Sequence, residues 1–275
     1  MADVKDFLDV LALEEVGPGR YRAGNLPGTA GPVFGGQILG QIIVAAARGE
    51  LHKRVRSIHA IFARGGRPDQ ALEIDVDTMH SGRSFASATV TVRQGDRLCT
   101  RALVLLGGEE PDLIRHAAVA PVVGEPEAAT ALEPYLVAGE LRAVGGVDLL
   151  DPDAVGPPHY DLWFRCPGAG SDQATNQAIL ADATDMFLIG TAMRPHRGVG
   201  QAMAHRSLDT GVVSHTLTFH QPLTVQDWHL LAHESPYAGG GRSYGRAHVF
   251  SRSGELVASF VQENMIRAHP AAEKH

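Results

Sequence analysis

Two polar residues stand in apolar surroundings and could do chemistry together. Asp185 lies in the mostly apolar segment 179–190, and Gln262 lies in the strand-like segment 256–265. A buried carboxylate without partners is costly, so Asp185 must have hydrogen-bond donors, face a cleft, or both. A carboxylate can orient or deprotonate water, and a glutamine amide both accepts and donates hydrogen bonds. We therefore predict that Asp185 and Gln262 meet in one active site.

Composition restricts the classes of protein and partner. The chain has 275 residues, 44% of them apolar, and a net charge of −7 without a block of Lys and Arg. This predicts one large domain or two ordinary ones, and it argues against nucleic acid or a membrane surface as the main partner. Two cysteines, Cys99 and Cys166, make a disulfide scaffold improbable. The acidic N-terminus and the lack of an apolar run of about 20 residues lead us to expect a cytoplasmic protein.

The elements that must position the two residues follow from hydrophobic periodicity. Residues 4–15 predict a short amphipathic helix, 15–23 a hairpin, and 37–47 a helix that is apolar almost all round and therefore buried. Four strands are then expected at 57–62, 71–79, 84–93 and 98–106, and alternation in 85–92 indicates antiparallel pairing. One buried helix followed by four such strands predicts a sheet curled around the helix.

The second half of the sequence repeats the first. Residues 82–98 align without a gap with 241–257, including a shared Gly-Arg-Ser-aromatic turn. The helix at 37–47 has a counterpart at 176–193, and Ser57–Phe62 has one at Ser214–Phe219. We predict two tandem α+β units that share one sheet, at 1–108 and 141–269, with a connecting segment at 109–140 and a tail at 270–275.

Several short motifs carry a resemblance to a known family. The motifs are Phe34-Gly-Gly-Gln37, Ser57-Ile-His-Ala-Ile-Phe62, Ser81-Gly-Arg-Ser-Phe85, Phe219-His-Gln-Pro222, Asp227-Trp228 and Val257-Ala-Ser-Phe-Val-Gln-Glu263. With these motifs, the chain resembles the TesB-type acyl-CoA thioesterase II family over about residues 5–268. The resemblance implies the double hotdog fold, in which a long helix is wrapped by an antiparallel sheet, twice.

The resemblance also implies a site made of an Asp on the second helix, a Ser or Thr on a following strand, and a Gln on the last strand. Asp185 and Gln262 match the first and third positions. Counting back without gaps from Phe219 places Val212 at the middle position, where a hydroxyl is expected. The candidate replacements are Ser214, predicted to share the strand face of Val212, and Thr210. A small insertion would instead select Ser207, so the choice stays open.

Other residues have an expected place in or outside this site. Asp182, one helical turn before Asp185, is interpreted as the solvated carboxylate of the pair. Histidines in apolar strands are interpreted as core residues, namely His59, His215 and His220. The substrate-contacting candidates are Gly35, Gly36, Met186, Phe187 and Phe219. The two glycines have close packing at the start of the helix as their alternative role.

The resemblance implies hydrolysis of acyl-CoA, which needs no cofactor or metal because the thiolate leaves readily. Asp185 would deprotonate water or attack the thioester to give an anhydride, and both mechanisms stay open. A hotdog hydratase is disfavoured because its Gly-Asp-x-Asn-Pro-x-His motif is missing. A non-catalytic acyl-CoA-binding protein is the main alternative, because Val212 lacks a hydroxyl. Open sheet edges predict a homodimer or higher oligomer.

Overall fold

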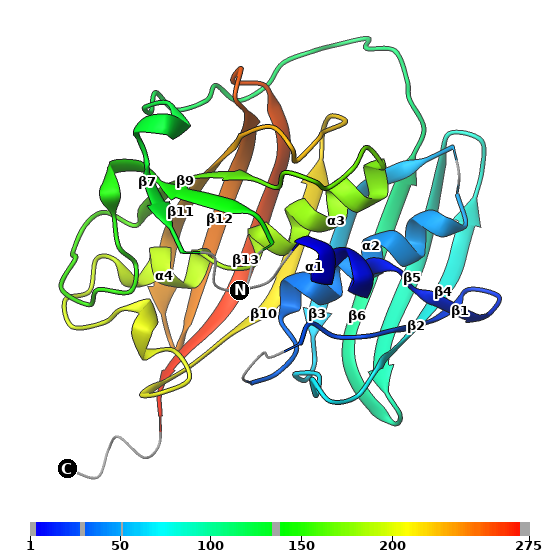
Figure 1. Cartoon of the computed structure of the whole chain (residues 1–275), viewed down its shortest axis with the longest axis horizontal. Coiled ribbons are helices and arrows are strands. Elements are labelled where there is room, and N and C mark those ends of the chain that lie inside the picture. Colours follow the sequence, from blue (N-terminus) through cyan, green and yellow to red (C-terminus); the bar gives the residue numbers. More distant parts are fainter. Residues whose placement is uncertain (1–3, 28–30, 51, 134–137, 270–275) are drawn as a thin grey trace.

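Thirteen strands form a single antiparallel sheet in the computed structural model, which describes residues 4–27, 31–50, 52–133 and 138–269 (Figure 1). The order across the sheet is β1-β2-β4-β5-β6-β3-β10-β13-β12-β11-β9-β8-β7. The strands of the first half are β1 (Glu14–Gly17), β2 (Arg20–Ala23), β3 (Arg54–Phe62), β4 (Leu72–Ser81), β5 (Phe85–Gln94) and β6 (Arg97–Gly107). Those of the second half are β7 (Thr130–Leu132), β8 (Glu140–Ala143), β9 (His159–Arg165), β10 (Leu208–Phe219), β11 (His229–Gly239), β12 (Arg242–Ser251) and β13 (Leu256–Ala268). The α-helices are α1 (Val4–Leu11), α2 (Gly35–Arg48), α3 (Gln173–Thr184) and α4 (Leu188–Met193).

Helices α2 and α3 lie side by side on one face of this sheet (Figure 1). A Cβ on Gly36 would lie 2.7 Å from the carbonyl oxygen of Asp182, and one on Gly40 would lie 3.1 Å from that of Ala178. The two helices therefore run antiparallel and approach too closely for larger side chains at these glycines. This packing places the N-terminus of α2 against the C-terminus of α3.

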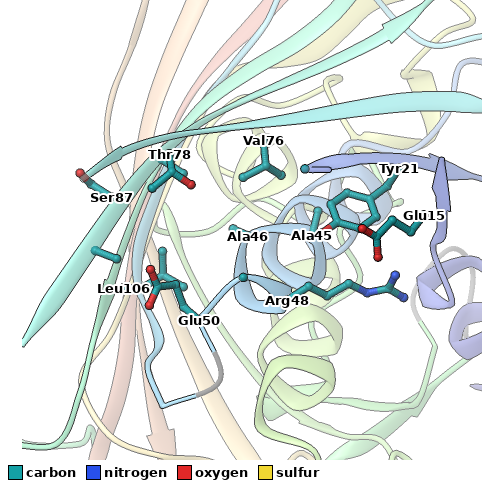
Figure 2. A pocket seen from close by; sticks show the side chains of 14 residues that line it. Glu15, Tyr21, Ala45, Ala46, Arg48, Glu50, Val76, Thr78, Ser87 and Leu106 are labelled. Carbon is teal, nitrogen blue, oxygen red and sulfur yellow. The ribbon is translucent and has the colours of Figure 1, made fainter. Parts of the chain in front are cut away.

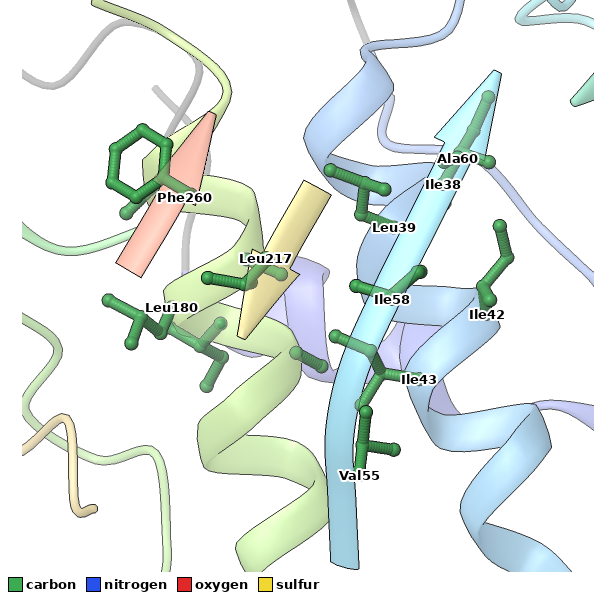
Figure 3. Packing of buried hydrophobic residues seen from close by; sticks show 14 of the residues in the cluster. Ile38, Leu39, Ile42, Ile43, Val55, Ile58, Ala60, Leu180, Leu217 and Phe260 are labelled. Atoms are coloured by element: carbon green, nitrogen blue, oxygen red, sulfur yellow. The ribbon is translucent and has the colours of Figure 1, made fainter. Parts of the chain in front are cut away.

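The core fills the space between the helices and the sheet (Figure 3). Ile38 and Ile42 of α2, Ile58 of β3, Leu180 of α3 and Leu217 of β10 are each at most 2% exposed. Helix α2 is buried on most of its surface, as its apolar sequence predicted. The hydrophobic effect thus fixes both helices over the centre of the sheet, where the two halves join.

The strand order supports the predicted repeat. The order β4-β5-β6-β3 in the first half corresponds to β11-β12-β13-β10 in the second, and β3 pairs with β10 to join the halves. The hairpins that align in the sequence are β5 with β6 and β12 with β13. The single shared sheet is as predicted, and the division into two α+β units stays a prediction.

Two predicted elements differ from the structure. The helix predicted at 176–193 is interrupted after Thr184, and α4 begins again only at Leu188. The segment 109–140, interpreted as a connection, also contains the short edge strand β7. The predicted tail at 270–275 lies outside the described residues.

Candidate active site

Asp185 lies at the C-terminal end of α3, where this helix meets the N-terminus of α2. The residue is 5% exposed, and the backbone N–H of Gly36 donates a hydrogen bond to its carboxylate. A Cβ on Gly35 would lie 2.5 Å from Asp185 Oδ2, so the carboxylate fits because residue 35 is glycine. Helix α2 therefore supplies one of the donors that a buried Asp185 requires.

Gln262 and His215 are opposite each other on neighbouring strands, and both side chains reach Asp185. The two residues are register partners on β13 and β10 and are 1% and 0% exposed. Gln262 Nε2 lies 2.9 Å from Asp185 Oδ1 and 2.8 Å from His215 Nδ1. His215 Nδ1 lies 3.3 Å from the same carboxylate oxygen. Asp185 and Gln262 therefore meet as predicted, and His215 joins them in a three-residue cluster, called the site cluster below.

The hydroxyl that reaches the site cluster comes from α3 instead of β10. Thr184 Oγ1 lies 3.2 Å from His215 Nε2 and donates a hydrogen bond to the carbonyl oxygen of Ala181 at 2.8 Å. The side chain is fully buried. Sequence reasoning did not consider Thr184, although its place directly before Asp185 in a buried helix was an available signal.

The structure does not bring Ser214 to the site cluster. Val212 pairs with Asn264 and Ser214 pairs with Glu263, so Val213 forms a bulge between them. A bulge places an extra residue on one strand and shifts the alternation of the side chains that follow. Val212 therefore shares the inner face with buried Asn264, whereas Ser214 shares the outer face with exposed Glu263. The expectation that Ser214 and Val212 lie on the same face is wrong.

Thr210 and Ser207 also lie away from Gln262. Thr210 is 7% exposed and pairs with Ile266, four residues along β13 from Gln262, which is about 13 Å along the strand. Ser207 precedes β10, and its backbone N–H donates to the carbonyl oxygen of Met203. Within the described residues, neither hydroxyl is hydrogen-bonded to the site cluster. The position of Val212 thus has no substitute hydroxyl on β10.

The apolar substrate-contacting candidates lie at different distances from Asp185. Met186 and Phe187 directly follow the end of α3 and are 9% and 6% exposed. The ring of Phe187 packs against Tyr160 at a centroid distance of 5.6 Å. Phe219 lies on the same face of β10 as His215 but four residues further, about 13 Å along the strand. Of these three, Met186 and Phe187 directly follow Asp185 in the chain, and Phe219 is far from it.

The pKa of Asp185 is set by opposing effects. Burial raises it above the usual range of an aspartate, while the neighbouring His215 and the backbone N–H of Gly36 lower it in part. A carboxylate with a raised pKa is a stronger base, and general-base efficiency improves as the pKa approaches the working pH. The environment of Asp185 therefore suits proton abstraction.

Asp182 is buried, so its interpretation as a solvated carboxylate is wrong. The residue is 0% exposed because α2 packs against it at Gly36, where a Cβ would lie 2.8 Å from the Asp182 Cα. Neither carboxyl oxygen has a hydrogen-bond partner among the described residues. Burial and the negative charge of Asp185 raise the pKa of Asp182 well above its usual range, and the nearby backbone N–H of Ala138 offsets this only in part.

Of the three histidines interpreted as core residues, His215 alone is buried. His59 and His220 are exposed on the outer face of the sheet. His59 Nδ1 lies 2.6 Å from Thr216 Oγ1, and His220 Nε2 lies 2.9 Å from Ser259 Oγ. The core interpretation is therefore wrong for His59 and His220. For His215 the burial was predicted, but its contact with Asp185 was missed because it depends on the pairing register of β10.

A hollow of about 450 Å³ lies at the opposite end of α2 from Asp185 (Figure 2). Ala45 and Ala46 of α2 line it together with Tyr21 and Arg48, whose guanidinium lies 5.2 Å from the centroid of the Tyr21 ring. The residues of the site cluster do not line this hollow. It is therefore separate from the candidate active site.

The part of the chain that the structure describes holds neither a candidate metal centre nor a membrane-spanning helix. No three His, Cys, Asp or Glu side chains gather there as a group that could hold a metal ion. None of the helices there is long and apolar enough to cross a membrane.

Comparison with known proteins gives consistent matches along the chain. The family models of the acyl-CoA thioesterase N-terminal domain and C-terminal domain match residues 24–107 and 112–266. Acyl-CoA thioesterase 2 of Haemophilus influenzae is 28% identical over 97% of this chain and 99% of its own length. Human acyl-coenzyme A thioesterase 8 is 27% identical over 95% of this chain and 88% of its own length.

Solved structures agree with these matches. A tesB protein of Mycobacterium avium subspecies paratuberculosis has a TM-score of 0.83 at 26% identity, covering 96% of this chain and 99% of its own. An acyl-CoA thioesterase II of Mycobacterium marinum has a TM-score of 0.80 at 25% identity, covering 96% of this chain and 98% of its own.

The sheet and the paired helices are those of a hotdog-type fold, and the family matches identify a thioester hydrolase. The chain belongs to the acyl-CoA thioesterase family, and its resemblance to the TesB-type thioesterases II is confirmed.

Proposed function

We propose that this enzyme hydrolyses fatty acyl-CoA to a free fatty acid and CoA through a water molecule held between Asp185 and Gln262. The observation that carries the proposal is Gln262 Oε1, which is buried and has no hydrogen-bond partner among the described residues. The Nε2 atom of the same amide is bonded to Asp185. A buried acceptor that stays unsatisfied is costly. A water that donates to Oε1 would satisfy it and would lie beside the carboxylate that accepts its other proton.

The remaining steps follow from the helix that meets Asp185. As Asp185 takes a proton, the water oxygen attacks the thioester carbon, and negative charge develops on the carbonyl oxygen. The first N–H groups of an α-helix have no partner within the helix, and this end carries a partial positive charge. The N-terminus of α2 at Gly35 is therefore assigned to oxyanion stabilisation, whereas the N–H of Gly36 is bonded to Asp185. Collapse of the intermediate breaks the carbon–sulfur bond and releases the CoA thiolate, which takes up a proton.

We infer that the two repeats form a double hotdog, with units at 1–108 and 141–269 joined by residues 109–140. The matching strand orders of the two halves and the packing of α2 and α3 on one face support this arrangement. In it, the thioester lies near Gly35 and Gly36, and the acyl chain begins beside Met186 and Phe187. Phe219, about 13 Å further along β10, is reached only by the distal part of a long chain.

A homodimer or higher oligomer is also proposed. Ile61 of β3 and Leu103 and Leu105 of β6 are 45%, 52% and 42% exposed on the outer face of the sheet. Adjacent exposed apolar side chains favour burial against another surface. Sedimentation velocity at micromolar concentration should give a dimer or larger species, and a monomer at these concentrations would contradict the proposal.

Binding of acyl-CoA without turnover is the alternative that the position of Val212 favours, because the expected hydroxyl is missing there. Thiol release from a panel of acyl-CoAs, from short to long chains, separates the two functions. We expect turnover of at least part of the panel. Binding of the panel without thiol release, measured by calorimetry on the same preparation, would identify a non-catalytic acyl-CoA-binding protein.

A further inference from the structure

We infer that His215 is a positioning residue that fixes the orientation of the Gln262 amide and thereby leaves Oε1 of that amide open to the attacking water. The inference rests on the hydrolysis proposed above. It assigns to His215, on β10, the support that the missing hydroxyl at Val212 does not give.

The first step concerns the two N–H bonds of the Gln262 amide. Gln262 Nε2 lies 2.9 Å from Asp185 Oδ1, 2.8 Å from His215 Nδ1 and 3.5 Å from the carbonyl oxygen of Thr184, so Oδ1 and Nδ1 are its two nearest acceptors. An imidazole nitrogen accepts a hydrogen bond only when it carries no proton. With Nδ1 accepting from Gln262, the imidazole of His215 carries its single proton on Nε2 in this arrangement.

The second step explains why the proton of His215 stays on Nε2. Thr184 Oγ1 lies 3.2 Å from this nitrogen. The hydroxyl proton of Thr184 is directed to the carbonyl oxygen of Ala181 at 2.8 Å, so Oγ1 is free to accept. The hydrogen bonds then run in one direction, from Gln262 to His215 and from His215 to Thr184. The backbone of α3 thus selects the tautomer of His215.

The third step compares the two orientations of the Gln262 amide. The reversed amide would place Oε1 against Asp185 Oδ1 and against the unprotonated Nδ1 of His215, so that acceptors would face acceptors. In the observed orientation Nε2 faces both of these acceptors, and Oε1 is left buried and unpartnered. His215 itself is held in place by Phe260, whose ring stacks on the imidazole at 5.6 Å and an interplanar angle of 8°.

Two substitutions at His215 test the inference. His215→Phe keeps a ring of similar shape but removes the acceptor, and we expect kcat to fall by about 10²-fold with little change in KM, as for a misplaced catalytic group. His215→Asn offers its side-chain oxygen near the place of Nδ1 and should recover most of this loss. The matched control is His229→Asn, because His229 is also buried but bonds to the carbonyl oxygen of Asp227, outside the site cluster. Its turnover should equal that of the unaltered protein.

A double-mutant cycle asks whether His215 acts through Gln262. In a Gln262→Ala background, His215→Phe should have little further effect, because no amide is left to orient. An equal loss in both backgrounds, or a Phe variant as active as the unaltered protein, would overturn the inference. Turnover by the unaltered protein is measured first, so a failure of the hydrolysis proposal is distinguished from a failure of this one.

The tautomer can be measured without turnover. Nitrogen-15 NMR of the imidazoles at neutral to mildly alkaline pH, with the His215 signals assigned by their loss in His215→Asn, should show protonated Nε2 and unprotonated Nδ1. A proton on Nδ1 would overturn the inference whether or not the protein hydrolyses acyl-CoA.

Discussion

Replacing Asp185 with asparagine should lower kcat/KM for acyl-CoA hydrolysis by about 10²–10⁴-fold, the range that general-base catalysis contributes. Asparagine keeps the size of the side chain, and its oxygen can still accept hydrogen bonds from Gln262 and from the Gly36 N–H. It cannot take a proton from water. Thiol release by the variant and the unaltered protein, with thermal unfolding of both, measures the loss and verifies the fold.

The control for this substitution is Asp77→Asn, which removes a carboxylate from an exposed position on β4. Its activity should match that of the unaltered protein. Activity retained by Asp185→Asn would place the catalytic base elsewhere. A single turnover in water labelled with oxygen-18 then separates the two mechanisms: label only in the released acid is expected, whereas label in the Asp185 carboxylate would show an anhydride.

The architecture was largely predictable because it depends on short-range patterns. Apart from Gln37, Gln41 and the terminal Arg48, helix α2 consists of glycine and apolar residues, which indicates burial before any strand is placed. The turns before β5 and β12 share the residues Gly-Arg-Ser-aromatic, so the repeat is visible as a local match at residues 82–85 and 241–244. Strands joined by such hairpins pair with their neighbours in the sequence, so few strand orders remain possible.

The site was predictable only in part because its third member depends on strand register. A one-residue bulge at Val213 puts Val212 on the face of β10 that is turned to the helices. The sequence gives no sign of the bulge, so Ser214 was predicted to share the face of Val212. Regular alternation back from Phe219 instead places His215 on the inner face and Ser214 on the outer one. The break in the helix after Thr184 also lacks a local sequence signal, because residues 185–187 include no Gly or Pro.

Asp182 is a different case, because the sequence contained the signal. Residues three apart on a helix lie on the same face, so an Asp185 that faces α2 implies that Asp182 lies on that side as well. Gly36 and Gly40 bring the two helices close enough to bury it. Assigning one carboxylate to the site and the other to solvent therefore conflicted with the helical period.

Burial of Asp182 predicts an unusual dependence of stability on pH. Its folded pKa is raised well above the usual value, so above about pH 4 the unfolded chain releases a proton that the folded protein retains. Stability therefore decreases as pH rises from the unfolded pKa toward the folded one, by at most about 1.4 kcal/mol per pH unit for one group. Asp182→Asn removes this group. The free energy of unfolding of the variant should therefore increase relative to that of the unaltered protein as pH rises from 4 to 8.

Urea unfolding of both proteins across this pH range measures the difference, and Asp77→Asn serves again as the exposed control. The sign of the slope is the decisive quantity, because the absolute difference at one pH also contains the unpaired amide that asparagine introduces beside Ala138. A difference that does not change with pH would mean that Asp182 binds no extra proton on folding. Burial also raises the pKa of Asp185, which the Asp182→Asn variant retains. The free energy of unfolding of this variant should therefore still decrease as pH rises, but with a smaller slope than in the unaltered protein.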